Sequence, residues 1–243
     1  MSTAPRPREL APSDHASSEL LQLNQEIIAC TRCPRLISYC KKIGREKRRA
    51  YLTWDYWARP VPSFGDPQAR VLILGLAPGA HGSNRTGRPF TGDGSGNFLY
   101  PVLYKAGFAS QPNGTHRDDG LRLTDAYITA TVRCAPPQNK PTPQEIANCS
   151  SHLDRELALL TNVKVVVVLG RIGFDAYLNY LKRRGELKSK SSFIFGHGEA
   201  YPLPNGRTLL CAFHPSLQNT NTGRLTEKML LDVFKKAAKL IHR

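Results

Sequence analysis

The sequence predicts an α/β protein of three layers, in which helices cover both faces of a central four-stranded, mainly parallel sheet. Four short runs are apolar or β-branched throughout, and they span residues 71–76, 126–132, 165–169 and 208–213. Strands that are buried on both faces show such continuous runs rather than alternation. Helical patterns separate the runs, as expected of a parallel sheet with helical crossovers. The functional crevice of such folds lies at the carboxyl ends of the strands.

Three segments carry clear helix signals. Residues 20–27 place leucine and isoleucine at helical spacing. A capping box begins at Thr142, and Pro143 occupies the first helical position. Residues 225–241 place apolar side chains along one side and lysines elsewhere. Because there is no internal repeat and no linker, we expect a single domain over residues 19–243.

Residues 1–18 have a different character. They contain three prolines together with serine and alanine, and they show no apolar periodicity. Such a segment cannot bury enough apolar surface to offset the entropy of ordering. We therefore expect residues 1–18 to form a disordered tail.

Composition narrows the classes of function. The 243 residues include 34 Lys and Arg against 19 Asp and Glu, a formal net charge of +15. This charge makes nucleic acid the first partner to consider, with a solvated basic face as the alternative. No apolar run reaches the roughly 20 residues of a membrane-spanning helix, and the start lacks the apolar core of a secretory signal. We therefore expect an intracellular protein without membrane association.

A glycine-rich loop follows the first predicted strand, at residues 75–93. Its sequence, GLAPGAHGSNRTGRPFTGD, matches neither a Walker loop nor a Rossmann fingerprint. Loops beyond about 12–15 residues are usually functional, and glycine lets backbone amides approach a ligand closely. Arg85 and Arg88 supply positive charge suited to phosphate, and Asp93 is the only carboxylate of the loop.

A second polar loop begins at His214, at the carboxyl end of the fourth predicted strand. Pro215 stiffens its backbone. Parallel strands end at one edge of the sheet, so His214 is expected to face the glycine-rich loop across the crevice. A capping or core role is the alternative for a lone histidine.

The six cysteines divide into two groups. In a reducing compartment they are more plausible as thiols or metal ligands than as disulfides. Cys40 and Cys211 are expected to be buried structural residues. A four-thiolate site would tie the N-terminal helix to the sheet, and both zinc and [4Fe–4S] fit its chemistry. Its members are Cys30, Cys33, Cys134 and Cys149.

Four motifs in order resemble the family 5, or B-type, uracil-DNA glycosylases of bacteria and archaea. They are CTRCPRL at 30–36, GLAPGAHGSNRTGRPFTGD at 75–93, VRCAPPQNKPTPQE at 132–145 and HPSLQNTNTGR at 214–224. The resemblance covers roughly residues 20–240. It implies a monofunctional glycosylase that hydrolyses the N-glycosidic bond of uracil, hypoxanthine and ethenocytosine in DNA. It also implies that the four-thiolate site holds a structural [4Fe–4S] cluster.

The resemblance carries roles onto particular residues. Asp93 occupies the position of the family's proposed acid residue and would orient a water and stabilise the sugar cation. His214 would donate a hydrogen bond to uracil O2. Phe90 would stack beneath the flipped base. The expected base-binding set is Phe90, Gly75, Ala77 and Gly79.

The expected partner is DNA with damaged bases, bound by a monomer in the cytoplasm of a prokaryote, at the nucleoid. Leu217 would fill the gap in the base stack. The expected DNA-binding residues are Arg85, Arg88, Leu217, Asn219, Asn221 and Arg224. Sister families read uracil with an asparagine in the strand before Cys134, where this chain has Ala130 and Thr131, so we expect weaker discrimination between bases. The alternative function is a non-catalytic nucleic-acid-binding module with a structural metal–thiolate site.

Overall fold

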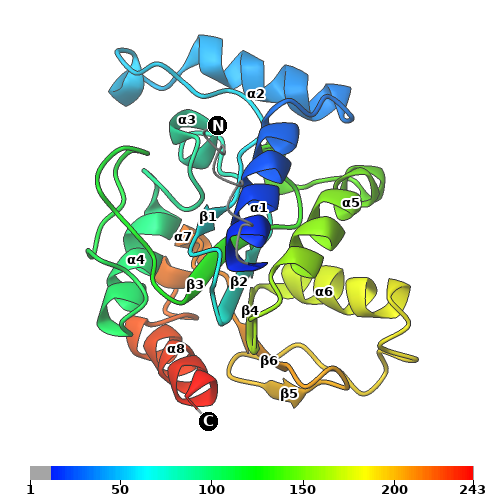
Figure 1. The fold of residues 1–243 in the computed structure, drawn as a ribbon. Coiled ribbons are helices and arrows are strands. Elements are labelled where there is room, and N and C mark those ends of the chain that lie inside the picture. The colour runs from blue at the N-terminus through cyan, green and yellow to red at the C-terminus, as the bar shows by residue number, and fades with distance from the viewer. Residues whose placement is uncertain (1–11, 243) are drawn as a thin grey trace, which may run out of the picture.

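Four parallel strands form the centre of the sheet (Figure 1). The computed structural model describes residues 12–242. The parallel strands are β2 (Val71–Gly75), β3 (Ala126–Ala130), β4 (Val165–Leu169) and β6 (Thr208–Ala212), adjacent in the order β3-β2-β4-β6. Nearly all of their residues are buried, which explains their continuous apolar runs.

Two short edge strands extend the sheet to six strands, two more than predicted. β1 (Phe64–Gly65) pairs antiparallel with β3, and β5 (Ala200–Pro202) pairs antiparallel with β6. Strands of two and three residues are too short to show a hydrophobic period. Pro202 is tolerated because an edge strand leaves one side of its backbone unpaired.

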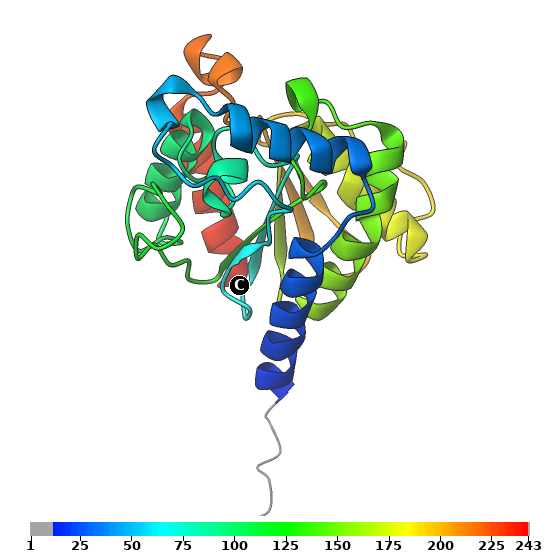
Figure 2. The same ribbon diagram turned by 90° about the horizontal axis from the view of Figure 1, so that it is seen from above.

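Helices cover both faces of the sheet, which confirms the three layers (Figures 1 and 2). One face packs against α1 (Pro12–Ile28), α5 (Pro143–Leu159) and α6 (Arg171–Arg183). The other packs against α4 (Gly94–Lys105) and α8 (Glu227–Ile241). None of the helices within residues 12–242 combines the length and hydropathy needed to cross a bilayer.

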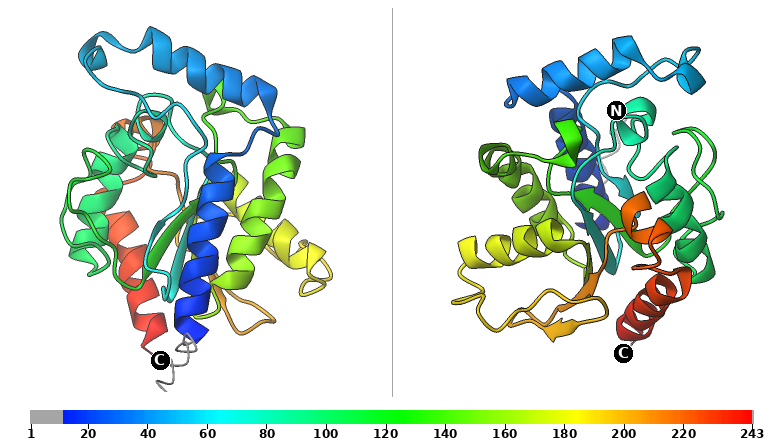
Figure 3. Two further views of the ribbon diagram at one scale, coloured as in Figure 1. Left: turned by 45° about the horizontal axis from the view of Figure 1, so that its top comes forward. Right: turned by 180° about the vertical axis from the view of Figure 1, so that it is seen from behind.

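The shorter helices gather around the edge where the parallel strands end (Figure 3). α3 (Ser83–Thr86) follows β2, the 3₁₀ helix η2 (Pro137–Asn139) follows β3, and α7 (Leu217–Asn221) follows β6. α2 (Pro34–Glu46) packs against α3 and leads into the 3₁₀ helix η1 (Arg49–Tyr51). These elements enclose the candidate site.

The first helix begins earlier than predicted. Residues 12–18 were expected in a disordered tail, but α1 begins at Pro12. A proline is accommodated in the first turn because the N–H groups there have no intrahelical acceptor. Residues 1–11 of the expected tail lie outside the described part of the chain.

Candidate active site

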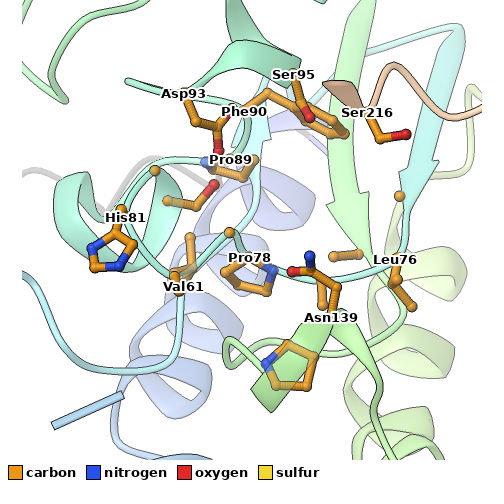
Figure 4. A pocket seen from close by; sticks show the side chains of 18 of the residues that line it. Val61, Leu76, Pro78, His81, Pro89, Phe90, Asp93, Ser95, Asn139 and Ser216 are labelled. Carbon is orange, nitrogen blue, oxygen red and sulfur yellow. The ribbon is translucent and has the colours of Figure 1, made fainter. Parts of the chain in front are cut away.

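A cavity of about 760 Å³ lies at the carboxyl edge of the sheet (Figure 4). The loops that follow β2, β3 and β6 contribute its walls. Phe90, Asp93 and His214 all line it, as do the predicted base-binding residues Gly75, Ala77 and Gly79. Segments far apart in the chain therefore meet here, at the edge where parallel strands expose their following loops.

Phe90 forms an aromatic platform with a fixed backbone. Its φ is +50°, in the left-handed region that is uncommon for a bulky residue. Its ring packs on Gly75, where a Cβ would lie 3.2 Å from the ring. The Tyr100 hydroxyl donates to the Pro89 carbonyl at 2.7 Å, which holds the preceding residue. The Phe90 and His214 ring centroids are 5.9 Å apart, with 33° between their planes.

Asp93 caps the N-terminus of α4. Its Oδ1 accepts a hydrogen bond from the Gly96 N–H at 3.0 Å. Its Oδ2 lies against the turn after β2, since a Cβ at Gly79 would be 2.7 Å away and one at Gly82 only 1.8 Å away. Burial raises the pKa of Asp93, and hydrogen bonds from the N–H groups of Gly96 and Ser95 partly oppose this shift. Two glycines thus make room for a half-buried carboxylate in the wall of the cavity.

His214 is held as a neutral imidazole. Burial lowers its pKa from 6.5 to about 4. Its backbone carbonyl accepts hydrogen bonds from the Asn219 side-chain amide and the Ser216 N–H, both at 2.8 Å. A neutral imidazole carries one N–H donor and one acceptor nitrogen. His214 can therefore donate a hydrogen bond in the cavity without carrying a charge.

Asn139 is a site residue that the sequence analysis missed. It lines the cavity from η2, and Figure 4 shows its amide on the opposite side from Asp93. Gln138 and Asn139 have φ values of +56° and +57°, which bend the chain back toward the cavity. A side-chain amide offers both a donor and an acceptor, the pair needed to read the edge of a pyrimidine. The available signal was an asparagine after two prolines, which favours a turn with left-handed backbone.

Arg85 and Arg88 are not on the rim of the cavity, contrary to the expectation of phosphate contacts there. Both are buried, 3% and 4% exposed. Arg88 makes a bidentate ion pair with Asp119, at 2.8 and 2.7 Å. Arg85 donates to two loop carbonyls, and its guanidinium lies 3.9 Å from the ring centroids of both Tyr51 and Trp54. The guanidinium N–H groups of Arg85 and Arg88 thus stabilise the glycine-rich loop, which has few apolar residues to bury.

The other expected DNA-binding residues lie on or near α7. Leu217 is 57% exposed, lines the cavity and packs over Gly94, so its position suits a wedge. Asn221 and Arg224 are exposed. The Asn219 amide instead holds the His214 carbonyl, so its nitrogen is used within the loop.

Three of the four predicted thiols lie close together in the structure. Cys33, Cys134 and Cys149 lie in one buried cluster that also contains Cys40. Cys30 is half-buried and lies outside this cluster. Contact with Cys40, then burial, raises the pKa of the Cys134 thiol, and burial raises the pKa of Cys149. All of these cysteines are free of disulfides.

Polar contacts fasten the CxxC segment to α5. Arg35 makes a bidentate ion pair with Glu145, at 2.7 and 2.6 Å. The Asn148 amide donates to Cys33 Sγ at 3.5 Å. Glu145 also completes the predicted capping box with Thr142, which begins α5 and so positions Cys149. Within residues 12–242, no three or more His, Cys, Asp or Glu side chains are arranged to hold a single metal ion.

The sequence is similar to known DNA glycosylases over most of its length. The model of the Uracil DNA glycosylase superfamily matches residues 62–238. A type-5 uracil-DNA glycosylase of Thermus thermophilus is 54% identical over 216 residues, which cover 89% of this chain and 95% of that protein. A type-5 enzyme of Mycobacterium tuberculosis is 45% identical over 225 residues, 92% and 82% of the two chains. A type-4 enzyme of Sulfurisphaera tokodaii is 27% identical over 225 residues, 91% and 84% of the two chains. The chain therefore belongs to the uracil DNA glycosylase superfamily and, within it, to the type-5 (B-type) enzymes.

Proposed function

We propose that this protein flips damaged bases out of DNA and hydrolyses their N-glycosidic bond, with uracil as a substrate and with Asp93 and His214 as its catalytic residues. The observation that carries the proposal is the convergence of Phe90, Asp93 and His214 on one cavity. A base inside a duplex must leave the stack before an enzyme can reach its glycosidic bond. The exposed face of Phe90 is the platform on which the extruded base stacks.

Bond cleavage makes the sugar cationic and the departing base anionic. In its ionised form the Asp93 carboxylate stabilises the developing cation and orients the attacking water, as carboxylates do in glycoside hydrolysis. Its raised pKa means that it is protonated at a higher pH than an exposed aspartate. The excision rate therefore falls on acidification as Asp93 takes up a proton.

His214 acts at the other end of the breaking bond. Its neutral imidazole donates an N–H to uracil O2, where negative charge develops. Removal of one such donor typically lowers a rate by about 10²–10³-fold. Because the ring is packed and its backbone is held by Asn219, the donor is oriented before the reaction begins.

We extend the proposal to hypoxanthine and ethenocytosine. The cavity lining next to β3 includes the small residue Ala130, and this stretch of the chain lacks the asparagine with which sister families read uracil. Asn139 is one side-chain amide in the lining that can read the base edge. A cavity with few polar contacts to the base discriminates weakly between a pyrimidine and a purine.

Base release from three duplexes tests these assignments. Duplexes with uracil, hypoxanthine or ethenocytosine are incubated with wild type, Asp93→Ala or His214→Ala and then treated with alkali, which breaks strands at abasic sites. We expect breakage by wild type on all three, and strongly reduced breakage by both variants. Binding without any breakage would indicate a non-catalytic nucleic-acid-binding module. Breakage confined to uracil would refute the broader substrate range.

We also propose a structural [4Fe–4S] cluster on Cys30, Cys33, Cys134 and Cys149. The burial of three of these thiols beside one another, without disulfides, supports the assignment. In such a cluster each thiolate binds a different iron, so its ligands are more widely spaced than those of a single ion. These residues would hold the cluster between α2 and α5, where it would stabilise the fold.

Iron and sulfide content, visible absorbance and thermal unfolding test the cluster. Cys149→Ala should lose colour and stability together, because one ligand is removed. Cys211→Ala is the matched control, since Cys211 is a buried thiol in β6, outside the proposed ligand set. Retained absorbance in Cys149→Ala would exclude Cys149 from the ligand set.

A further inference from the structure

A second cavity, of about 300 Å³, contains none of the residues assigned above to chemistry. It adjoins the base cavity across α3, since Ser83 lines the first cavity and Thr86 lines the second. Figures 1 and 3 show the loop between α4 and β3, which carries Arg117, beside α3. The residues that line it are Asp55, Tyr56, Trp57, Arg59, Arg85, Thr86 and Arg117.

Trp57 supports two guanidinium groups in this cavity. Arg59 Cζ lies 4.2 Å and Arg117 Cζ 4.4 Å from its ring centroid. The indole itself is fixed, because Nε1 donates to the Pro60 carbonyl at 3.0 Å. The ring also packs so closely on Gly87 that a Cβ there would lie 2.8 Å from it. With these neighbours, little of the ring is left for a stacked base.

The positive charge in this cavity is not balanced by the protein. Arg59 and Arg117 are both exposed, and neither makes an ion pair with any residue of the described chain, 12–242. Arg85 is buried behind them, and its Nη1 has no hydrogen-bond partner. Asp55 is the single carboxylate of the lining. Guanidinium groups on one ring repel each other, and an anion placed between them relieves that repulsion.

We propose that Arg59 and Arg117, supported by Trp57, bind a backbone phosphodiester of the substrate DNA outside the nucleotide being excised. The guanidinium fork matches the geometry of phosphate oxygens. The cavity shares α3 with the base cavity. A DNA molecule bound over the catalytic loop would therefore bring a backbone phosphate close to Arg59 and Arg117. The net charge of +15 favours a polyanion over a small acid. This inference rests on the proposed function.

The test measures how affinity depends on salt. The probe is a DNA duplex of the same length as the uracil substrate, with a tetrahydrofuran abasic analogue in place of the uracil nucleotide. Fluorescence anisotropy gives its Kd from 50 to 300 mM KCl. Loss of one phosphate contact lowers the slope of log affinity against log salt by about 1. The double variant Arg59→Ala/Arg117→Ala should show this change and bind about tenfold more weakly at low salt.

A matched control removes the same charge elsewhere. Lys235 and Lys236 are exposed on α8 and line neither cavity, so Lys235→Ala/Lys236→Ala should keep the wild-type slope. Arg59→Gln/Arg117→Gln is the second variant, should the alanine pair fold poorly. Shortening the duplex from either end separates a phosphate contact from a structural role of the two arginines. Wild type should lose affinity at the length where the contacted phosphate is removed, and the variant should not.

Two results would overturn the inference. One is a wild-type slope and affinity in both arginine variants, and the other is an equal loss in the lysine control. The excision rate at saturating DNA should be unchanged in the arginine variants, because neither residue lines the base cavity. Failure of the proposed function would look different, since wild type would then release no uracil whatever the salt dependence of binding.

Discussion

The protonation state of His214 gives the sharpest test of the mechanism. With a pKa of about 4, only about one molecule in a thousand carries an imidazolium at pH 7, three pH units above it. A mechanism that needed the imidazolium would lose that factor of about 10³. The neutral ring keeps one N–H, and its removal should raise the barrier by about 3–4 kcal/mol, a rate loss of about 10²–10³-fold.

Single-turnover excision of uracil between pH 4.5 and 9 measures this. Wild type should show no change in rate near pH 6.5, and its rate should fall toward pH 4.5 as His214 and Asp93 take up protons. His214→Asn keeps an N–H donor and should retain more activity than His214→Ala. In Asp93→Asn the part of the fall in rate toward pH 4.5 that comes from protonation of the carboxylate should be absent. A wild-type rate that falls as pH rises through 6.5, together with a flat profile in His214→Asn, would refute the neutral donor.

Three further predictions concern packing and charge. Gly79→Ala should push the Asp93 carboxylate out of place, because its Cβ would lie 2.7 Å from Oδ2; we expect about 10²-fold slower single-turnover excision with an unchanged unfolding temperature. Glu156→Ala should lower the free energy of unfolding by about 3–5 kcal/mol in urea titrations, because it leaves the guanidinium of Arg133, now 2.5 Å from Glu156 and fully buried, without its partner; a loss below 1 kcal/mol would contradict this. Burial lowers the pKa of His152 to about 4. Between pH 6.5 and 4 the unfolded chain therefore binds a proton at His152 that the folded protein does not bind, so the free energy of unfolding falls over this range. His152→Leu should remove about 2 kcal/mol of that loss at pH 5, measured by urea unfolding at pH 5 and 7, and an unchanged pH dependence would count against it.

The parallel core was predictable because each of its strands is buried on both faces. The predicted runs end within two residues of the observed strands, and the capping box at Thr142 marks the start of α5 correctly. The rule for parallel sheets also brought Phe90, Asp93 and His214 to one edge. These features follow from local patterns and from a topology that the patterns imply.

Features that depend on distant partners were not predictable. Arg88 is buried because Asp119 meets it from another loop, and no local pattern marks that pairing. Asn139 enters the cavity through two left-handed residues in succession, which sequence spacing does not show. The start of α1 was missed because residues 12–18 lack apolar periodicity and resemble a linker.

The backbone of Phe90 has a consequence for how bases of different size are received. Gly96 lies so close to the Phe90 carbonyl that even a methyl group there would overlap it, and Gly75 sits directly behind the ring. These contacts leave the Phe90 ring no room to tilt or move back when a larger base binds. A bicyclic base must then gain its room from the facing wall, so variants in the turn at Gln138 are where purine and pyrimidine preferences should separate.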